Sequence, residues 1–273
     1  MPWRVHKLLD NADVLAVAPP PRVALVPNAV AFRDPRHGLM GTGWQACAGQ
    51  ANAFGCKPQG TISITSDGGR TWTVLLRTPR PVVAVTISGK SEQARFDDGE
   101  TIGSSDGGLH WAPVVTGTSP AFSGPCPAFT SEFVSGAWAV CATQSSAGNQ
   151  GKYVYRLLAK GWKRIAATPF APPVGKSHGG ISTYGYVQGI AMASDGFGVI
   201  WESRGTLYVT RDGGRDWTGL PTVAQPEVDF GAAAFALPHG IAFALLANGG
   251  GEKRRLVETT DAGRSWRVVH VWQ

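Results

Sequence analysis

The carboxylates are the side chains of this sequence whose chemistry is easiest to recognise. In glycoside hydrolases, a pair of carboxylates cleaves the glycosidic bond. One serves as the acid, and the other as the base or nucleophile on the opposite side of the scissile bond. Asp97, Asp98 and Glu100 lie close together, in a stretch that we interpret as an exposed turn. Further carboxylates that no motif marks, but that could line a binding face, are Asp195, Glu202, Glu227 and Asp229. The chain contains no GxSxG, HExxH, phosphate-loop or dinucleotide-binding motif.

Four more aspartates belong to an octapeptide that the chain repeats. The copies are TSDGGRTW at 65–72, SSDGGLHW at 104–111, TRDGGRDW at 210–217 and TTDAGRSW at 259–266. An Asp in such a turn can accept hydrogen bonds from neighbouring backbone N–H groups, and the glycine that follows tolerates a left-handed conformation. Turn geometry thus explains the pattern without a substrate. We interpret these positions as structural: Thr65, Asp67, Gly69, Trp72, Ser104, Asp106, Gly108, Trp111, Thr210, Asp212, Gly214, Trp217, Thr259, Asp261, Gly263 and Trp266.

Short apolar segments flank each octapeptide and predict a β-hairpin around it. GTISI precedes the first copy and WTVLL follows it. A second pattern, two apolar segments separated by a polar turn and a Gly, lies upstream, as in NAVAFRDPRHGLMGTGW (28–44) and GIAMASDGFGVIWE (189–202). Each unit therefore has about four strands, and its Trp recurs at 72, 111, 162, 217 and 266. Four-strand units at roughly 40–55-residue spacing are typical of a β-propeller.

We therefore predict an all-β fold, a β-propeller of about five four-stranded blades. A single domain over 28–273 would hold blades at approximately 28–78, 79–117, 126–168, 185–222 and 227–273. The third blade carries a decayed octapeptide, which keeps Trp162 but has Leu157 where the Asp belongs. Residues 1–27 hold a strand around Trp3 and a Pro-rich linker, which we interpret as an added edge strand or the stub of a further blade.

Charge and hydropathy exclude several classes of function. The net charge is +6, and the basic residues are scattered apart from small clusters at 160–164 and 253–255. A nucleic-acid binder concentrates such charge on one face, so we expect a solvated surface and no nucleic-acid partner. No run of about 18 apolar residues occurs, and we expect no transmembrane segment.

The four cysteines fall into two local pairs, Cys47 with Cys56 and Cys126 with Cys141. Neither pair has the spacing of a zinc site, and we predict two disulfides. Disulfides place the protein outside the reducing cytosol, either secreted or periplasmic. The first residues, MPWRVHKLLDNADV, have no apolar signal core, so this interpretation presumes a signal peptide that is absent from the sequence. Free thiols are the alternative.

The octapeptide resembles the Asp box, or BNR repeat, and over 28–273 the chain resembles Asp-box β-propellers of the sialidase-like superfamily. AVAFRDPRHGLMGTG followed by GTISITSDGGRTW is most similar to photosystem II stability/assembly factor-like proteins. Sialidases, xyloglucan hydrolases and sortilin-type receptors also carry these boxes. In such proteins the boxes lie at the blade periphery, away from the central ligand-binding face. The resemblance therefore implies a fold rather than a catalytic site.

A sialidase would need arginines for the substrate carboxylate, a Tyr–Glu nucleophile pair and an Asp acid/base. The resemblance offers Arg33, in FRDP, as the first arginine. Tyr184, Tyr186 and Glu202 are further candidates for a ligand-facing cleft. The alternative is that FRDP is the ordinary joint between strand and turn, because ASDG at 193–196 and ALPH at 236–239 occupy equivalent places. We favour this alternative.

The sequence as a whole favours a non-catalytic, secreted or periplasmic propeller that binds or scaffolds a protein or glycan. The alternative is a glycoside hydrolase of the sialidase or xyloglucanase type, either complete or as one part of a longer enzyme. We predict no catalytic residue, no cofactor, no metal site and a monomeric state. His37 and His239 recur at matching repeat positions before Gly, which turn packing explains better than metal binding.

Overall fold

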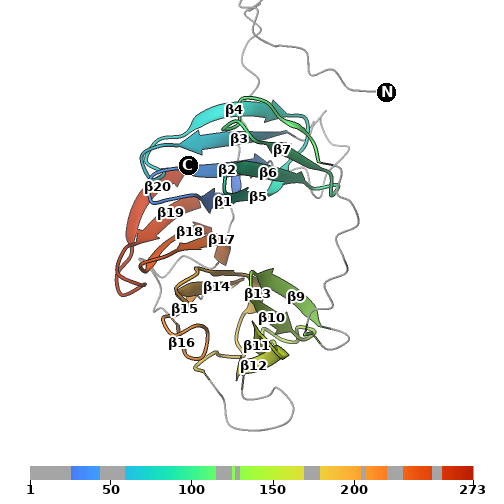
Figure 1. Ribbon diagram of the computed structural model, residues 1–273, viewed down its shortest axis with the longest axis vertical. Coiled ribbons are helices and arrows are strands. Elements are labelled where there is room, and N and C mark those ends of the chain that lie inside the picture. The colour runs from blue at the N-terminus through green and yellow to red at the C-terminus, as the bar shows by residue number, and fades with distance from the viewer. Residues whose placement is uncertain are drawn as a thin grey trace, which may run out of the picture.

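A computed structural model gives the structure of the chain (Figure 1). It describes residues 26–43, 59–114, 125–126, 130–168, 179–203, 207–219, 230–247 and 254–272. These ranges form twenty β-strands and no helix. The predicted Trp3 strand, the linker that follows it and the Cys47–Cys56 pair lie outside the described residues.

The strands form five antiparallel four-stranded blades, so the predicted fold class is confirmed. Blade 1 contains β1 (Val26–Phe32), β2 (Gly38–Gly43), β3 (Gly60–Thr65) and β4 (Thr73–Thr78). Blade 2 contains β5 (Val82–Ser88), β6 (Ser91–Phe96), β7 (Thr101–Ser104) and β8 (Ala112–Pro113). Blade 3 contains β9 (Ser131–Ser135), β10 (Trp138–Ala142), β11 (Lys152–Leu158) and β12 (Gly161–Ala167). Blade 4 contains β13 (Tyr186–Met192), β14 (Gly198–Ser203), β15 (Leu207–Thr210) and β16 (Trp217–Gly219). Blade 5 contains β17 (Phe230–Leu237), β18 (Ile241–Ala247), β19 (Arg254–Thr259) and β20 (Arg267–Trp272).

Position within a blade decides how deeply a strand is buried. The second strands of blades 1 and 3, β2 and β10, are buried along their whole length, and each has a strand on either side. The outer strands β4 and β20 are largely exposed. The first strands also share an irregularity: β1, β5, β13 and β17 all shift register near their beginning. A β-bulge at one place in four blades marks the unit as a repeat, and the bulge bends the inner strand.

The first strands of the blades lie side by side around the centre in the order β5, β1, β17, β13, β9. Blade 5 therefore lies between blades 1 and 4, and a single backbone pairing of Ser203 with Phe230 joins its sheet to that of blade 4. Among the described strands, β5 and β9 share no packing of that extent. The ring is thus interrupted between the consecutive blades 2 and 3. Figure 1 shows blades 1, 2 and 5 in one half of the molecule and blades 3 and 4 in the other.

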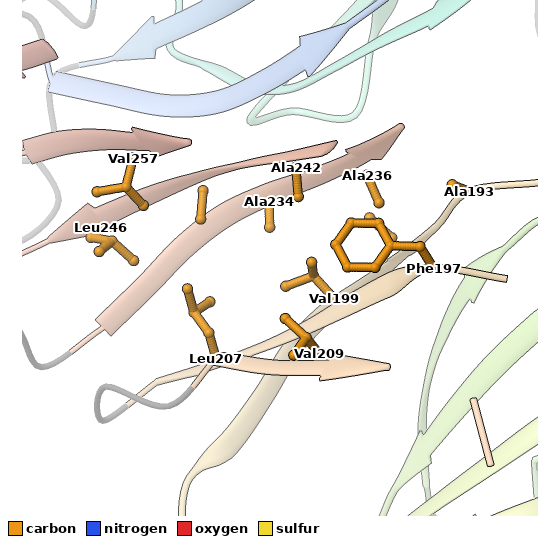
Figure 2. Packing of buried hydrophobic residues seen from close by; sticks show 12 residues of the cluster. Ala193, Phe197, Val199, Leu207, Val209, Ala234, Ala236, Ala242, Leu246 and Val257 are labelled. Atoms are coloured by element: carbon orange, nitrogen blue, oxygen red, sulfur yellow. The ribbon is translucent and has the colours of Figure 1, made fainter. Parts of the chain in front are cut away.

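Apolar side chains fill the spaces between neighbouring blades. Phe32 of blade 1 stacks on Phe243 of blade 5, with ring centroids 3.6 Å apart. Between blades 4 and 5 the layer is built from small residues (Figure 2): Val199, Leu207 and Val209 face Ala234, Ala236 and Ala242. Phe197 lies at one end of this layer (Figure 2). Alanines let the two sheets approach closely. The apolar area buried in the layer stabilises the fold by roughly 25 cal/mol per Å².

Candidate functional site

The four octapeptides, hereafter the repeat turns, have one hydrogen-bonding scheme. In each turn the first hydroxyl donates to the Asp Oδ1, at 2.8–2.9 Å, and accepts the N–H of the second Gly, at 2.8–3.0 Å. The same Oδ1 accepts the backbone N–H four residues further on, at 2.9–3.1 Å. The second Gly is left-handed every time, with φ between +77° and +89°. Each turn therefore holds itself together without help from a ligand.

These bonds also fix the charge of the four carboxylates. Hydrogen bonds from the Thr71 side chain and backbone hold the pKa of Asp67 well below its usual range, and His110 and Ser265 do the same for Asp106 and Asp261. Burial raises the pKa of Asp212, but backbone and side-chain hydrogen bonds outweigh it and lower the pKa overall. Carboxylates held ionised in this way are poor proton donors at neutral pH. They lie on separate blades, and within the described residues no His, Cys, Asp or Glu cluster is suited to a metal ion.

The fourth repeat turn departs from the other three. The indole N–H groups of Trp72, Trp111 and Trp217 each donate to a glycine carbonyl of their own turn, at 2.9–3.0 Å. The buried Nε1 of Trp266 has no such partner within the described residues. In this turn Ala262 replaces the first glycine and is forced to a φ of +60°. A left-handed alanine carries strain that glycine avoids.

Arg33 does not lie with the other predicted site residues. It follows β1 in blade 1, and its guanidinium donates to the carboxylate of Glu92 in blade 2, at 2.9 Å. Glu92 is buried, whereas Arg33 remains 43% exposed. The pair therefore connects blade 1 to blade 2.

Glu202, Tyr184 and Tyr186 do come together, around a lysine that the sequence analysis missed. Lys152 Nζ lies 2.6 Å from Glu202 Oε1, and both side chains are sealed, with 1% and 0% exposure. The ammonium also donates to the carbonyls of Ser182 and Tyr184, at 2.7 and 2.8 Å. The ammonium therefore has three oxygen atoms around it. The pair joins β11 of blade 3 to β14 of blade 4.

The two tyrosines belong to the segment that closes this site. Tyr186 accepts the Gly148 N–H on its hydroxyl, at 2.9 Å, so it secures the segment to blade 3. The Tyr184 side chain is half exposed. Tyr184 contacts the ion pair through its backbone carbonyl, which accepts a hydrogen bond from Lys152. Gly185, with a φ of +84°, lies over the Glu202 carboxylate, where any side chain would collide with Oε2. The segment 182–186 thus lies directly against both members of the ion pair.

Burial dominates the electrostatics of this site. Loss of solvation raises the pKa of Glu202 to about 7, and Lys152 offsets only part of the effect. Burial likewise lowers the pKa of Lys152, while Glu202 acts in the opposite direction. Burial also raises the pKa of the Tyr208 phenol, whose oxygen accepts the Ser182 N–H at 3.1 Å. A carboxyl group with a pKa near 7 suits acid/base catalysis, but the side chain of Glu202 is fully buried.

A second site, open to solvent, lies between blades 4 and 5 at the repeat-turn end. This groove of about 350 Å³ is lined by Asp195, Phe197, Arg211, His239, Gly240, Thr260, Asp261, Ala262 and Arg264. Asp195 holds its two walls together, because its carboxylate accepts the N–H of Phe197 in its own blade and of His239 in blade 5, at 3.1 and 2.6 Å. His239 has a φ of +66°. The sequence had pointed to Asp195 only as an unmarked face carboxylate and to His239 only as a turn residue.

Cys126 and Cys141 form a disulfide, with their Cα atoms 5.3 Å apart. Cys141 is fully buried in β10, so the bond ties the approach to blade 3 onto the second strand of that blade. Within the described ranges, no helix has the length and hydropathy needed to cross a membrane.

No protein-family model and no curated protein matches the chain. Among solved structures it is similar to YCF48 bound to a D1 peptide, at 16% identity and a TM-score of 0.34, over 90% of this chain and 82% of that one. YCF48 from Cyanidioschyzon merolae is similar at 16% identity and a TM-score of 0.33, over 91% of this chain and 72% of that one. A GH74 xyloglucanase from Xanthomonas campestris is similar at 14% identity and a TM-score of 0.33, over 90% of this chain and 45% of that one. These values are too low to assign a family, a ligand or an activity.

Proposed function

We propose that this chain is a non-catalytic β-propeller that presents a rigid surface to a protein or glycan partner. One observation carries the proposal: the carboxyl group with a pKa suited to acid/base chemistry, Glu202, is sealed against solvent by residues 182–186. A hydrolase needs its acid and base on either side of an accessible bond. Glu202 instead faces Lys152, whose ammonium also donates to the backbone carbonyls of Ser182 and Tyr184.

The repeat turns support the same conclusion. Their aspartates use Oδ1 to fix their own turns, and they lie on separate blades. Their resemblance to Asp boxes fits an architectural role at the blade periphery. A propeller whose turns hold themselves together can vary the side chains on its surface without losing the fold.

The Cys126–Cys141 disulfide supports a secreted or periplasmic location. Such bonds persist in oxidising compartments and are rare in the cytosol. Counting free thiols in the unfolded, unreduced protein tests this part of the proposal. We expect none, and four titratable thiols would contradict it.

An activity assay separates this proposal from a glycoside hydrolase, which the raised pKa of Glu202 would favour. The purified protein is incubated with fluorogenic sialosides and with xyloglucan oligosaccharides, beside a Glu202→Gln variant that circular dichroism shows to be folded. We expect no turnover above the buffer rate for either protein. Hydrolysis by the wild type that the folded variant loses would overturn the proposal.

A further inference from the structure

The groove between blades 4 and 5 carries positive charge that the fold itself does not use. Arg211 is exposed, and within the described part of the chain no hydrogen bond or ion pair engages its guanidinium. Arg264 uses one N–H, to the Asp261 carbonyl at 3.0 Å, and keeps its other donors. A guanidinium with free donors matches a carboxylate, to which it can make two parallel hydrogen bonds.

Arg211 also departs from the pattern of the repeat turns. At the second position of the turn the other copies have small hydroxyl residues: Ser66, Ser105 and Thr260. The hydrogen bonds that hold the turn do not involve this side chain in any copy. Turn architecture therefore gives no reason for an arginine at 211. The groove does, because Arg211 lies in its lining.

The acidic residues of the groove define the rest of the ligand. Asp195 accepts two backbone N–H groups, and Asp261 accepts hydrogen bonds within its own turn, yet both line the groove. Their remaining lone pairs can accept hydrogen bonds from hydroxyl groups but repel further carboxylates. Thr260 adds a hydroxyl that can donate or accept. Arginines beside groups that can accept hydrogen bonds from hydroxyls suit a ligand that carries one carboxylate among several hydroxyls.

The shape and backbone of the groove fit a small polar ligand. Its volume of about 350 Å³ lies near the lower end of the range typical of small-molecule sites. His239, which lines one wall, has a left-handed backbone conformation that a glycine would adopt more readily. Strain of this kind is often retained where a side chain is needed at a binding surface. His239 and Arg211 both belong to the lining of the groove.

We propose that this groove binds an acidic sugar unit, with Arg211 and Arg264 contacting its carboxylate and with Asp195, Asp261 and Thr260 contacting its hydroxyls. The inference rests on the proposed function, because it chooses a glycan as the partner of a non-catalytic surface. It differs from the sialidase hypothesis, since the groove lies at the repeat-turn end of the blades and contains neither Arg33 nor Glu202.

Calorimetric titration at low ionic strength tests the proposal, with trigalacturonate as the acidic probe, maltotriose as the neutral one and triglutamate as the acidic peptide. We expect the wild type to prefer trigalacturonate to both of the others. The Arg211→Gln variant should lose about tenfold or more in affinity, as for loss of a charged hydrogen-bonding partner. Arg215→Gln is the matched control, because it removes the same charge from the same turn outside the groove, and it should bind like the wild type.

Three outcomes would overturn the inference: no trigalacturonate binding by the wild type, equal losses in the two arginine variants, or tighter binding of triglutamate. None of these would restore a catalytic function, which the hydrolysis assay tests separately. Conversely, hydrolysis of sialosides would overturn the proposed function while leaving the groove titration to be judged by its own result.

Discussion

Blade 4 meets its two neighbours in opposite ways. Against blade 3, at the end of the strands remote from the repeat turns, it closes over the Lys152–Glu202 ion pair, and no polar atom of the pair reaches solvent. Against blade 5 the interior is an alanine-rich apolar layer, and the charged residues gather outside it, in the groove at the repeat-turn end. Charge that is buried and paired belongs to the architecture. Charge that is exposed and unused is available to a ligand.

The free-energy terms at the two junctions differ accordingly. A buried ion pair is costly to break, since removing one partner leaves the other desolvated and alone. An exposed arginine costs little to remove, because water replaces whatever it contacted. Substitutions at the blade 3–4 junction should therefore change stability, and those in the groove should change binding. The following predictions test this difference, beginning with the largest effect.

The largest effect should come from Glu202→Ala, which leaves the Lys152 ammonium buried without its counter-ion. We expect a loss of about 3 kcal/mol in the free energy of unfolding, measured by urea titration at pH 8. A double variant, Lys152→Met with Glu202→Leu, should recover part of the loss, because it removes both charges and fills the space. A loss in Glu202→Ala no greater than that of an exposed substitution would show that the junction is open to water.

A smaller change in the free energy of unfolding should accompany a change in pH. The pKa of Glu202 is raised from about 4.5 in the unfolded chain to about 7 in the folded protein. Between these values the folded state keeps a proton that the unfolded state has released, so this group makes folding less favourable as pH rises through the window. We expect the stability of the wild type, relative to Glu202→Gln, to fall between pH 4.5 and about 7. A constant difference across that range would contradict the burial of Glu202.

At the blade 4–5 junction, glycine should stabilise the two strained positions. His239 and Ala262 have φ values of +66° and +60°, and glycine removes the steric cost of each. We expect His239→Gly and Ala262→Gly each to raise the free energy of unfolding by about 1 kcal/mol. His239→Gly should at the same time weaken trigalacturonate binding. Loss of stability in both variants would show that the side chains support the fold rather than the groove.

The smallest change in stability should come from Arg211→Gln, which we expect to stay within about 0.5 kcal/mol of the wild type. Thermal unfolding beside Arg215→Gln provides the comparison. A marked loss in Arg211→Gln alone would place Arg211 in the architecture and remove the contrast between the two junctions.

The repeats explain why so much of the fold was predictable. The Asp and Gly of each turn, and the Trp of three turns, act on neighbours within their own octapeptide, so their spacing alone indicates the hairpin. Blade 3 was also found, although Leu157 replaces the Asp, because Trp162 and the flanking apolar segments keep their phase. The interruption of the ring between blades 2 and 3 leaves no such local signal, since it depends on how whole blades pack.

The two junctions of blade 4 were harder to predict for the same reason. Lys152 opens a largely apolar strand, KYVYRLL, which is the only hint of its burial, and its partner Glu202 lies in another blade. The groove combines two turns of blade 4 with two turns of blade 5. Arg211, an arginine where the other turns have Ser or Thr, is the one signal in the sequence that could have pointed to it.

Amine labelling tests the central claim most directly, namely that the charged pair between blades 3 and 4 is sealed and therefore architectural. The native protein is acetylated briefly and mapped by mass spectrometry, with the exposed Lys160 and Lys163 of the same blade as internal controls. We expect both controls to react while Lys152 stays unmodified until the protein is unfolded. Labelling of Lys152 in the native protein at a rate near that of the controls would contradict the account.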